Sequence, residues 1–525
     1  MSFINSRGVR IVLAVLFVVA CIGLRLAWLP NDPPDWLSWS SGVYTDEGFY
    51  TLDARHRVLF GTLAPGNFHD SYTAPLLSGI QTIWFRAIGV GLAQARLLDV
   101  VFALLTIGLF WDTLRRRSGN IDTKHATPLL GKGAERPGAS ISTAATVMLG
   151  LSPVYLFYND LALQETPALF WIVLALWLTT IAHQIEGPKP DNLGAMPTAL
   201  GRHVAPAISI ATAGACLVAA FATKSLSVLA APAIVAAVWF PLLSKERVRV
   251  RLTALAAGLA LAGTIYAALC WYPHHTEIAR MSTYYAQHQI LPHTATSLWL
   301  NIRRAFIGGE NGVVPYLLAT MPVSTILATV AFRRSRPVAI DPVPVVWLAC
   351  GLAFCMFSRY APSRYYVLFL PALCWLAAIG WCGLPTTWRR LSLTLSALVS
   401  IVWVGAAWQH RTQTVLKAQL ELDGIMRTRP VIIGDFAPEL ALGTNLQAAP
   451  VQPGLSNDNR PVETLEPYCV FISHSPYWLG WWRKRYPAII QPGYLWKSIV
   501  LGGHGQYVVD IYANPKYVRP RNNAN

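Results

Sequence analysis

Long apolar stretches alternate with short polar segments over most of the chain. Apolar runs of near-spanning length and low charge recur through the first 410 residues, a pattern typical of helices that cross a membrane. A further apolar run, 74–92, is interrupted by Arg86, and we expect it to be a juxtamembrane helix along the membrane face. We expect about eleven spans, near residues 9–29, 97–114, 140–158, 166–183, 205–222, 226–243, 252–272, 313–332, 343–357, 365–383 and 391–409.

From His410 onward the pattern changes to polar residues with Pro and Gly turns. Short runs rich in β-branched residues predict strands at 431–435, 469–473 and 506–512, and residues 438–445 suit an intervening helix. The predicted fold class is therefore a polytopic α-helical membrane protein with a small C-terminal α/β domain.

These patterns divide the chain into two parts. The first is a transmembrane module, residues 1–409, whose first outer loop covers 30–96 and contains the juxtamembrane helix 74–92. The second is an α/β domain over 410–525, which ends in a polar tail.

The positions of the basic residues predict the orientation. Arg7 and Arg10 precede the first span, so we expect a cytoplasmic N-terminus. An odd number of spans then places the C-terminal domain outside, in a multi-pass protein of a bacterial inner or plasma membrane.

Composition agrees with this interpretation, with 54% hydrophobic and 13% charged residues. The net charge of +16 lies mostly in short loops between spans, which argues against a nucleic-acid partner. The eight cysteines show no metal-binding spacing.

Asp46 and Glu47 are the leading candidates for chemistry. They follow the first span in an aromatic-flanked segment, and ionised carboxylates there require a wet or protein-lined pocket. Other charged side chains are expected on the same face of the membrane: His69, Asp70, Asp160, Glu165, Lys224, Arg359 and Arg364.

Each of these further residues also has a simpler structural explanation. Lys224 and Glu165 suit snorkelling from span ends, and Asp160 suits a cap of the helix beginning near Leu161. His69 and Asp70 suit an ordinary loop surface, and Arg359 and Arg364 suit lipid-headgroup anchors.

The order of the motifs resembles that of the GT-C glycosyltransferases, which use polyprenyl-phosphate sugars. The pattern is most similar to the protein O-mannosyltransferase and lipid A aminoarabinose transferase group. The similarity rests on Asp46-Glu47-Gly48-Phe49-Tyr50, Thr73-Ala74-Pro75-Leu76, Leu161-Ala162-Leu163-Gln164-Glu165-Thr166-Pro167, Phe221-Ala222-Thr223-Lys224, Ser363-Arg364-Tyr365-Tyr366 with the residues up to Leu373, and Val431-Ile432-Ile433-Gly434-Asp435.

Two positions depart from the lipid A group. Thr73-Ala74 stands where that group has an acid and a lysine, and Ser225 replaces the usual glycine after Lys224. The first departure argues against a lipid A acceptor and against that group's metal site.

The resemblance implies an integral-membrane glycosyltransferase that moves a sugar from a polyprenyl-phosphate donor to an acceptor hydroxyl, with inversion. Asp46 would be the base, and Glu47 or Glu165 would orient the acceptor or hold a divalent cation with Asp46. The donor phosphate would be bound by Lys224, Arg359 and Arg364, with support from Asp160, His69 and Asp70.

The partners implied are the lipid-linked donor, a lipid, glycan or protein acceptor, and membrane lipids. A divalent metal cation stays open as a cofactor, and no other cofactor is expected. Two alternatives also stay open. A transporter or flippase of lipid-linked sugars predicts inverted repeats, and none is evident. An oligosaccharide ligase predicts a large outer ligand-binding loop.

Overall fold

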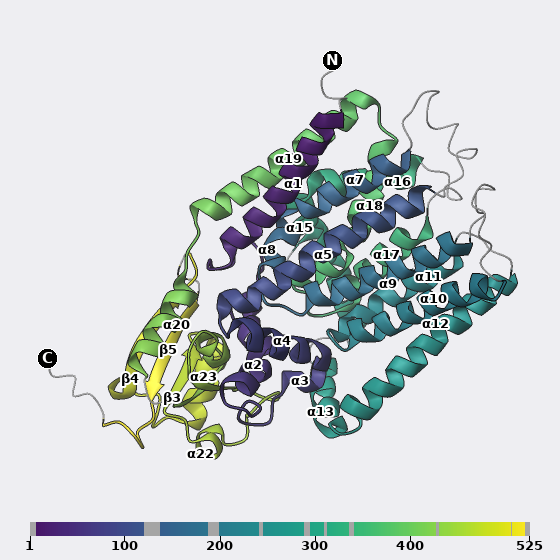
Figure 1. Ribbon diagram of the computed structural model, residues 1–525. Coiled ribbons are helices and arrows are strands. Elements are labelled where there is room, and N and C mark those ends of the chain that lie inside the picture. Colours follow the sequence, from purple (N-terminus) through teal and green to yellow (C-terminus); the bar gives the residue numbers. More distant parts are fainter. Residues whose placement is uncertain are drawn as a thin grey trace.

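A computed structural model describes most of the chain (Figure 1). The described residues are 7–119, 137–186, 199–240, 245–287, 294–308, 312–334, 341–426, 430–503, 505 and 507–519. The end of the predicted span 226–243 and Gln506, at the start of the predicted third strand, lie outside them.

Helices form a bundle that makes up most of the molecule (Figure 1). Its elements are α1 (Arg7–Trp28), α5 (Leu92–Gly119), α7 (Pro137–Gly150), α8 (Pro153–Asn159), α9 (Glu165–Glu186), α10 (Ala199–Phe221), η3 (Ser225–Ala230), α11 (Ala231–Trp239), α12 (Lys245–Tyr266), η4 (Ala267–Trp271), α15 (Val313–Thr320), α16 (Pro322–Arg334), α17 (Pro342–Phe357), η7 (Ser363–Phe369), α18 (Leu370–Cys382) and α19 (Thr386–Gln409).

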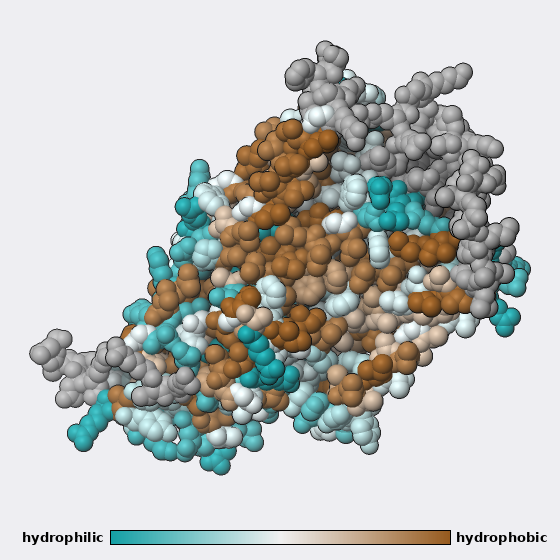
Figure 2. Space-filling view, in the orientation of Figure 1, coloured by the Kyte–Doolittle hydropathy of each residue, from teal (hydrophilic) through white to brown (hydrophobic). Residues whose placement is uncertain are grey.

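Within the described residues, six helices are long and apolar enough to cross a membrane. Two bent helix pairs, α7–α8 at 59° and α15–α16 at 114°, each supply one more candidate, and three shorter apolar helices complete the set. Together these segments coincide with the eleven predicted spans. Figure 2 shows hydrophobic side chains over the bundle, where residues such as Leu261 and Ile401 are exposed. The chain is therefore a multi-pass membrane protein, as predicted.

Shorter helices gather at one end of the bundle, beside the first residues of α5 (Figure 1). They are η2 (Ser41–Tyr44), α2 (Asp46–Leu59), α3 (Asp70–Thr73), α4 (Pro75–Ile88), α13 (His275–Tyr285) and α14 (Ala295–Ile307). The predicted helix 74–92 corresponds to α4. Pro75 occupies its first turn, and Gly89, at φ +89°, ends it before α5 begins.

The C-terminal region forms a five-stranded mixed sheet in the order β2-β1-β3-β5-β4. β1 is parallel to both β2 and β3, and β5 is antiparallel to β3 and β4. The elements are α20 (Thr414–Ile425), β1 (Val431–Gly434), α21 (Ala437–Ala441), β2 (Gln447–Pro450), α22 (Pro461–Leu465), β3 (Cys469–Ser473), α23 (Pro476–Arg485), η8 (Pro492–Tyr494), β4 (Leu495–Leu501) and β5 (Tyr507–Ala513).

Both faces of this sheet are covered. On one face Ile432, Phe471 and Ile511 join the core that continues into the helical bundle. On the other face Ile433 and Val470 pack with the buried Trp482 of α23. The three predicted strands are present as β1, β3 and β5, whereas β2 and β4 were not predicted. The small C-terminal α/β domain of the predicted fold class is thus confirmed.

Candidate functional site

Four charged side chains meet at the end of the bundle next to the C-terminal sheet. Asp46 is the first residue of α2, and Glu165 is the first residue of α9. Lys224 directly precedes η3, and Arg364 lies in the first turn of η7. Each therefore comes from the start of a different helix.

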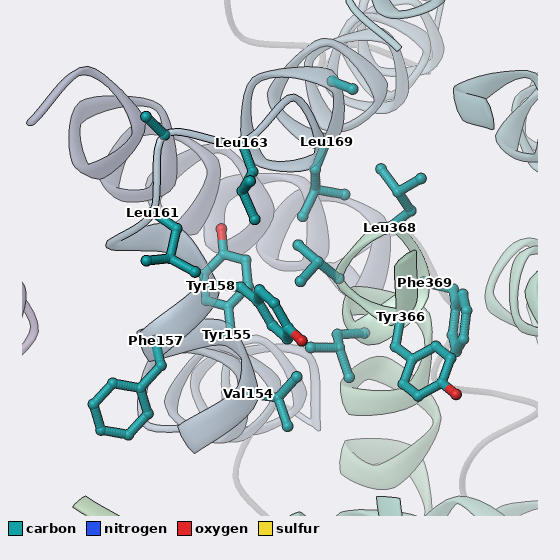
Figure 3. Close-up of a cluster of buried hydrophobic side chains, with 14 of the residues drawn as sticks. Val154, Tyr155, Phe157, Tyr158, Leu161, Leu163, Leu169, Tyr366, Leu368 and Phe369 are labelled. Carbon is teal, nitrogen blue, oxygen red and sulfur yellow. The ribbon is translucent and has the colours of Figure 1, made fainter. Parts of the chain in front are cut away.

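A packed hydrophobic cluster holds two of these helix starts in place (Figure 3). Leu163 and Leu169 flank Glu165 in sequence, and Tyr366 follows Arg364 closely. These side chains pack with Tyr158 of α8 in one buried core. Tyr158 also hydrogen-bonds to the hydroxyl of Ser363 at 2.7 Å, next to Arg364. The backbone positions of Glu165 and Arg364 are consequently fixed by close packing.

The four charged side chains form two ion pairs, which are linked by a third, longer contact. Arg364 Nη1 lies 2.6 Å from Asp46 Oδ2, and Lys224 Nζ lies 3.1 Å from Glu165 Oε1. A longer contact of 3.7 Å joins Arg364 Nε to Glu165 Oε1. The Glu165 side chain is 1% exposed, while Asp46 is the most open of the four at 17%. We call Asp46, Glu165, Lys224 and Arg364 the charge cluster.

Two tyrosines, Tyr50 and Tyr365, contact residues of the charge cluster. The Tyr50 hydroxyl accepts a hydrogen bond from Lys224 Nζ at 3.3 Å and donates to Asp46 Oδ2 at 3.5 Å. Lys224 also lies 5.2 Å from the Tyr365 ring centre, and the Arg364 guanidinium lies 5.3 Å from it. Both cations therefore gain cation–π attraction. Sequence reasoning missed Tyr50, although its i+4 spacing from Asp46 would place both on one helix face.

Gly42 of η2 leaves the space that Arg364 occupies. A Cβ atom at this position would lie 2.2 Å from Arg364 Nη1 and 3.0 Å from Asp46 Oδ2. A larger residue here would displace the Arg364 guanidinium, so Gly42 leaves room for the ion pair.

Asp46 is the more accessible of the two carboxylates in the charge cluster. Burial raises the pKa of its carboxyl, against the lowering effect of Arg364 and Lys224. A carboxylate with a raised pKa holds an abstracted proton better near neutral pH.

Glu47 lies apart from the charge cluster. Arg96 of α5 donates to both of its carboxylate oxygens, at 2.8 and 2.6 Å. The Ala162 amide donates to the same carboxylate at 2.7 Å. Adjacent helical residues diverge by about 100° around the axis, so Asp46 and Glu47 face different partners. Glu47 therefore joins α2 to α5 and to the turn before α9, and its expected catalytic role stays a prediction.

The remaining predicted residues lie in other settings. Asp160 is the C-cap residue of α8 and is fully buried, where an N-terminal helix cap was one expectation. Arg359 is exposed in the segment before η7. His69 and Asp70 form a separate network around Asp53. His69 Nδ1 lies 3.1 Å from the Asp53 carboxylate, and the Asp53 amide donates to Asp70 at 3.1 Å.

Among the described residues, no group of three or more His, Cys, Asp or Glu side chains is placed to hold a metal ion. The nearest carboxylates, Asp46 and Glu165, each lie against a cation instead.

The helical bundle and the C-terminal sheet define a multi-pass membrane protein that shares the fold of the GT-C glycosyltransferases, as the resemblance predicted. No protein-family model matches the chain, and no characterised protein matches its sequence.

The fold is similar to that of ArnT from Cupriavidus metallidurans. The ArnT structure bound to undecaprenyl phosphate is 14% identical and aligns with a TM-score of 0.52 over 95% of this chain and 98% of ArnT. The apo ArnT structure is 15% identical, with a TM-score of 0.51 over 95% and 97% of the two chains. An Archaeoglobus fulgidus oligosaccharyltransferase tethered with an acceptor peptide is 10% identical, with a TM-score of 0.47 over 90% of this chain and 70% of the other.

Proposed function

We propose that this protein transfers a sugar from a polyprenyl-phosphate donor to an acceptor hydroxyl. The observation that carries the proposal is the charge cluster, in which two cations and two carboxylates from separate helix starts meet. A phosphate leaving group departs as an anion and requires cations more than a general acid.

Lys224 and Arg364 are the proposed phosphate ligands. Without donor, their charges are balanced by Glu165 and Asp46. An incoming phosphate competes with Asp46 for the Arg364 guanidinium, whose planar fork suits a phosphate. The N-terminus of α9 carries the partial positive charge of the helix dipole, which adds to the attraction for the phosphate. Donor binding therefore frees the Asp46 carboxylate as it fixes the donor.

Asp46 then takes the proton from the acceptor hydroxyl. The acceptor oxygen bonds to the anomeric carbon as the bond from that carbon to the phosphate oxygen breaks. The polyprenyl phosphate leaves as an anion between Lys224 and Arg364. Attack opposite the leaving group gives inversion, as in the base-assisted chemistry of inverting glycosidases. The Tyr50 hydroxyl hydrogen-bonds to both Asp46 and Lys224 and so fixes their relative position.

A small apolar pocket adjoins the charge cluster. It lies between α9, η3, α17 and η7, and its lining includes Trp347, Phe354 and Phe369. Tyr365 borders both the pocket and the two cations. We assign the first part of the prenyl chain to this apolar lining, and the fold shared with ArnT bound to undecaprenyl phosphate supports a lipid-phosphate donor.

The site would open to the outer side of the membrane. α5 runs from the end of the bundle at α2 and α4 to the opposite end, where it carries Arg115, Arg116 and Arg117 (Figure 1). A basic cluster is typical of the cytoplasmic end, which supports an outer site and an outer C-terminal sheet.

The test uses the purified protein with a panel of radiolabelled polyprenyl-phosphate sugars and hydroxyl acceptors. We expect release of polyprenyl phosphate and labelled product from at least one donor, and loss of both with Asp46→Asn. Translocation of intact donor in vesicles without release of polyprenyl phosphate would favour a flippase and contradict the proposal.

A further inference from the structure

Helix α2, which carries Asp46 at its first position, has no local cap. Thr45 stands at the N-cap position, but its side chain makes no capping hydrogen bond. The first amides of a helix lack intrahelical partners, and an N-cap side chain usually satisfies the second or third of them. The start of the proposed catalytic helix therefore depends on an acceptor from elsewhere.

Glu439 of α21 supplies that acceptor. The Gly48 amide, third in α2, donates to Glu439 Oε2 at 2.7 Å across 391 residues of sequence. The Glu439 side chain is 1% exposed, so water does not compete for this bond. The Glu439 backbone is held in turn, because Gln419 of α20 donates to its carbonyl oxygen at 2.8 Å.

The two backbones also approach too closely for any side chain between them. A Cβ atom at Gly48 would lie 2.2 Å from the Glu439 backbone nitrogen and 2.4 Å from its Cα. Further along α2, Arg55 donates to the carbonyl oxygens of Thr444 and Leu446 at 2.7 and 2.6 Å. One helix therefore joins the C-terminal sheet region to the charge cluster.

We propose that Glu439 is a positioning residue for glycosyl transfer, which caps α2 from the C-terminal domain and thereby fixes the place of Asp46. The inference rests on the proposed function, in which Asp46 is the base. Lys224 and Arg364 belong to other elements, so the cap acts first on the base, and it reaches Lys224 only through the Tyr50 hydroxyl. Small misplacements of a reacting group reduce turnover steeply.

Burial disfavours a charge on the capping group. Burial and the nearby Glu47 raise the pKa of Glu439 well above its ordinary value. Glutamine has the same shape and keeps an oxygen acceptor for the Gly48 amide. It is therefore the conservative variant that preserves the cap.

The experiment compares Glu439→Ala and Glu439→Gln in the full-length protein, with donor affinity and turnover measured separately. We expect Glu439→Ala to lower kcat about tenfold or more, with the donor Kd within about twofold of the parent. Glu439→Gln should recover most of the turnover. Glu421→Ala is the matched control, since Glu421 makes an exposed ion pair with Lys497 in the same region. It should leave both quantities unchanged.

Gly48→Ala tests the same contact from the other side, and it should lower kcat with donor affinity retained. If Glu439→Ala fails to fold, Glu439→Asp, which withdraws the carboxyl by one methylene, takes its place with the same expected direction. Parent-like turnover in both Gly48→Ala and the folded Glu439 variant, beside an inactive Asp46→Asn, overturns the positioning role and leaves the proposed function standing. Parent-like turnover in Asp46→Asn overturns the role of Asp46 as the base, and absence of turnover in the parent with every donor tested overturns the proposed function itself.

Discussion

The guanidinium of Arg364 lies 2.6 Å from the carboxylate of Asp46, although the two residues come from opposite parts of the sequence. A carboxylate in such a pair is poorly available as a base, since removing it from its cation costs interaction energy. Under the proposed mechanism, the donor phosphate takes over Arg364. Binding of the first substrate thus prepares the base for the second.

Asp46→Asn should separate binding from chemistry. The amide keeps the size of the side chain but removes the base, so turnover should fall by about two orders of magnitude or more. Donor affinity should be retained or increased, because no carboxylate competes for Arg364. Single-turnover kinetics and direct donor titration check the two parts, and near-parent turnover would contradict the role of Asp46.

Lys224→Ala and Arg364→Ala should each weaken donor binding by about tenfold or more, since each removes a charge-assisted contact. Arg364→Lys should recover only part of the affinity because a point charge replaces a planar fork. Arg359→Ala provides the comparison. Arg359 is exposed, so its contribution should be smaller. Donor titration with a defined polyprenyl-phosphate sugar measures the affinity of all four variants. Parent-like affinity in all of them would indicate that these cations anchor the protein to lipid headgroups instead.

Glu47→Gln should destabilise the protein rather than abolish the chemistry selectively. Arg96 and Glu47 are 0% and 1% exposed and form a bidentate pair. Removing one charge of a buried pair leaves the other uncompensated, at a cost of about 3–5 kcal/mol. Thermal unfolding in detergent should show a clearly lowered midpoint. An unchanged midpoint with lost turnover would instead indicate direct participation of Glu47.

Asp435 should make stability depend on pH. Burial raises the pKa of its carboxyl to about 6 from an ordinary 3.8, against hydrogen bonds from Ser473. The folded state therefore binds a proton that the unfolded state releases between these values. The associated stability is fully present below about pH 4 and is lost as pH rises through 6, by about 3 kcal/mol. The unfolding midpoint of the parent should therefore fall relative to that of Asp435→Asn as pH rises from 4 to 7. The variant should show the flatter pH profile.

The orientation can be tested with reporters. A fusion after Gln409 should report the outer side, and a fusion at Gly119 should report the cytoplasm. An inner signal from the first fusion would show that the number of crossings is even.

The parts of the fold that depend on local composition could be predicted. The eleven apolar segments follow from hydrophobicity alone, and β1 and β3 follow from runs of β-branched residues. β2 could not be predicted, because Gln447–Pro450 has no strand-forming residue and pairs only through its register with β1. The predicted helix 438–445 is present only as the shorter α21.

The charge cluster was predictable in its members but not in its pairing. Sequence order placed Asp46 on the first outer loop and Glu165, Lys224 and Arg364 near span ends, and the fold brings the four together. The role of Glu47 was hidden because its partner Arg96 lies 49 residues away on another helix. The cap from Glu439 is more remote still, since no local pattern indicates a contact across 391 residues.

This last contact has a consequence for biogenesis. Helix α2 leaves the ribosome early, whereas Glu439 is synthesised only after the spans of the bundle. Until then, the start of α2 lacks its acceptor, and a partly made chain holds no finished site. Under the proposed function, incomplete chains would not consume lipid-linked sugar, because the site would become competent only when the C-terminal region has folded onto the start of α2.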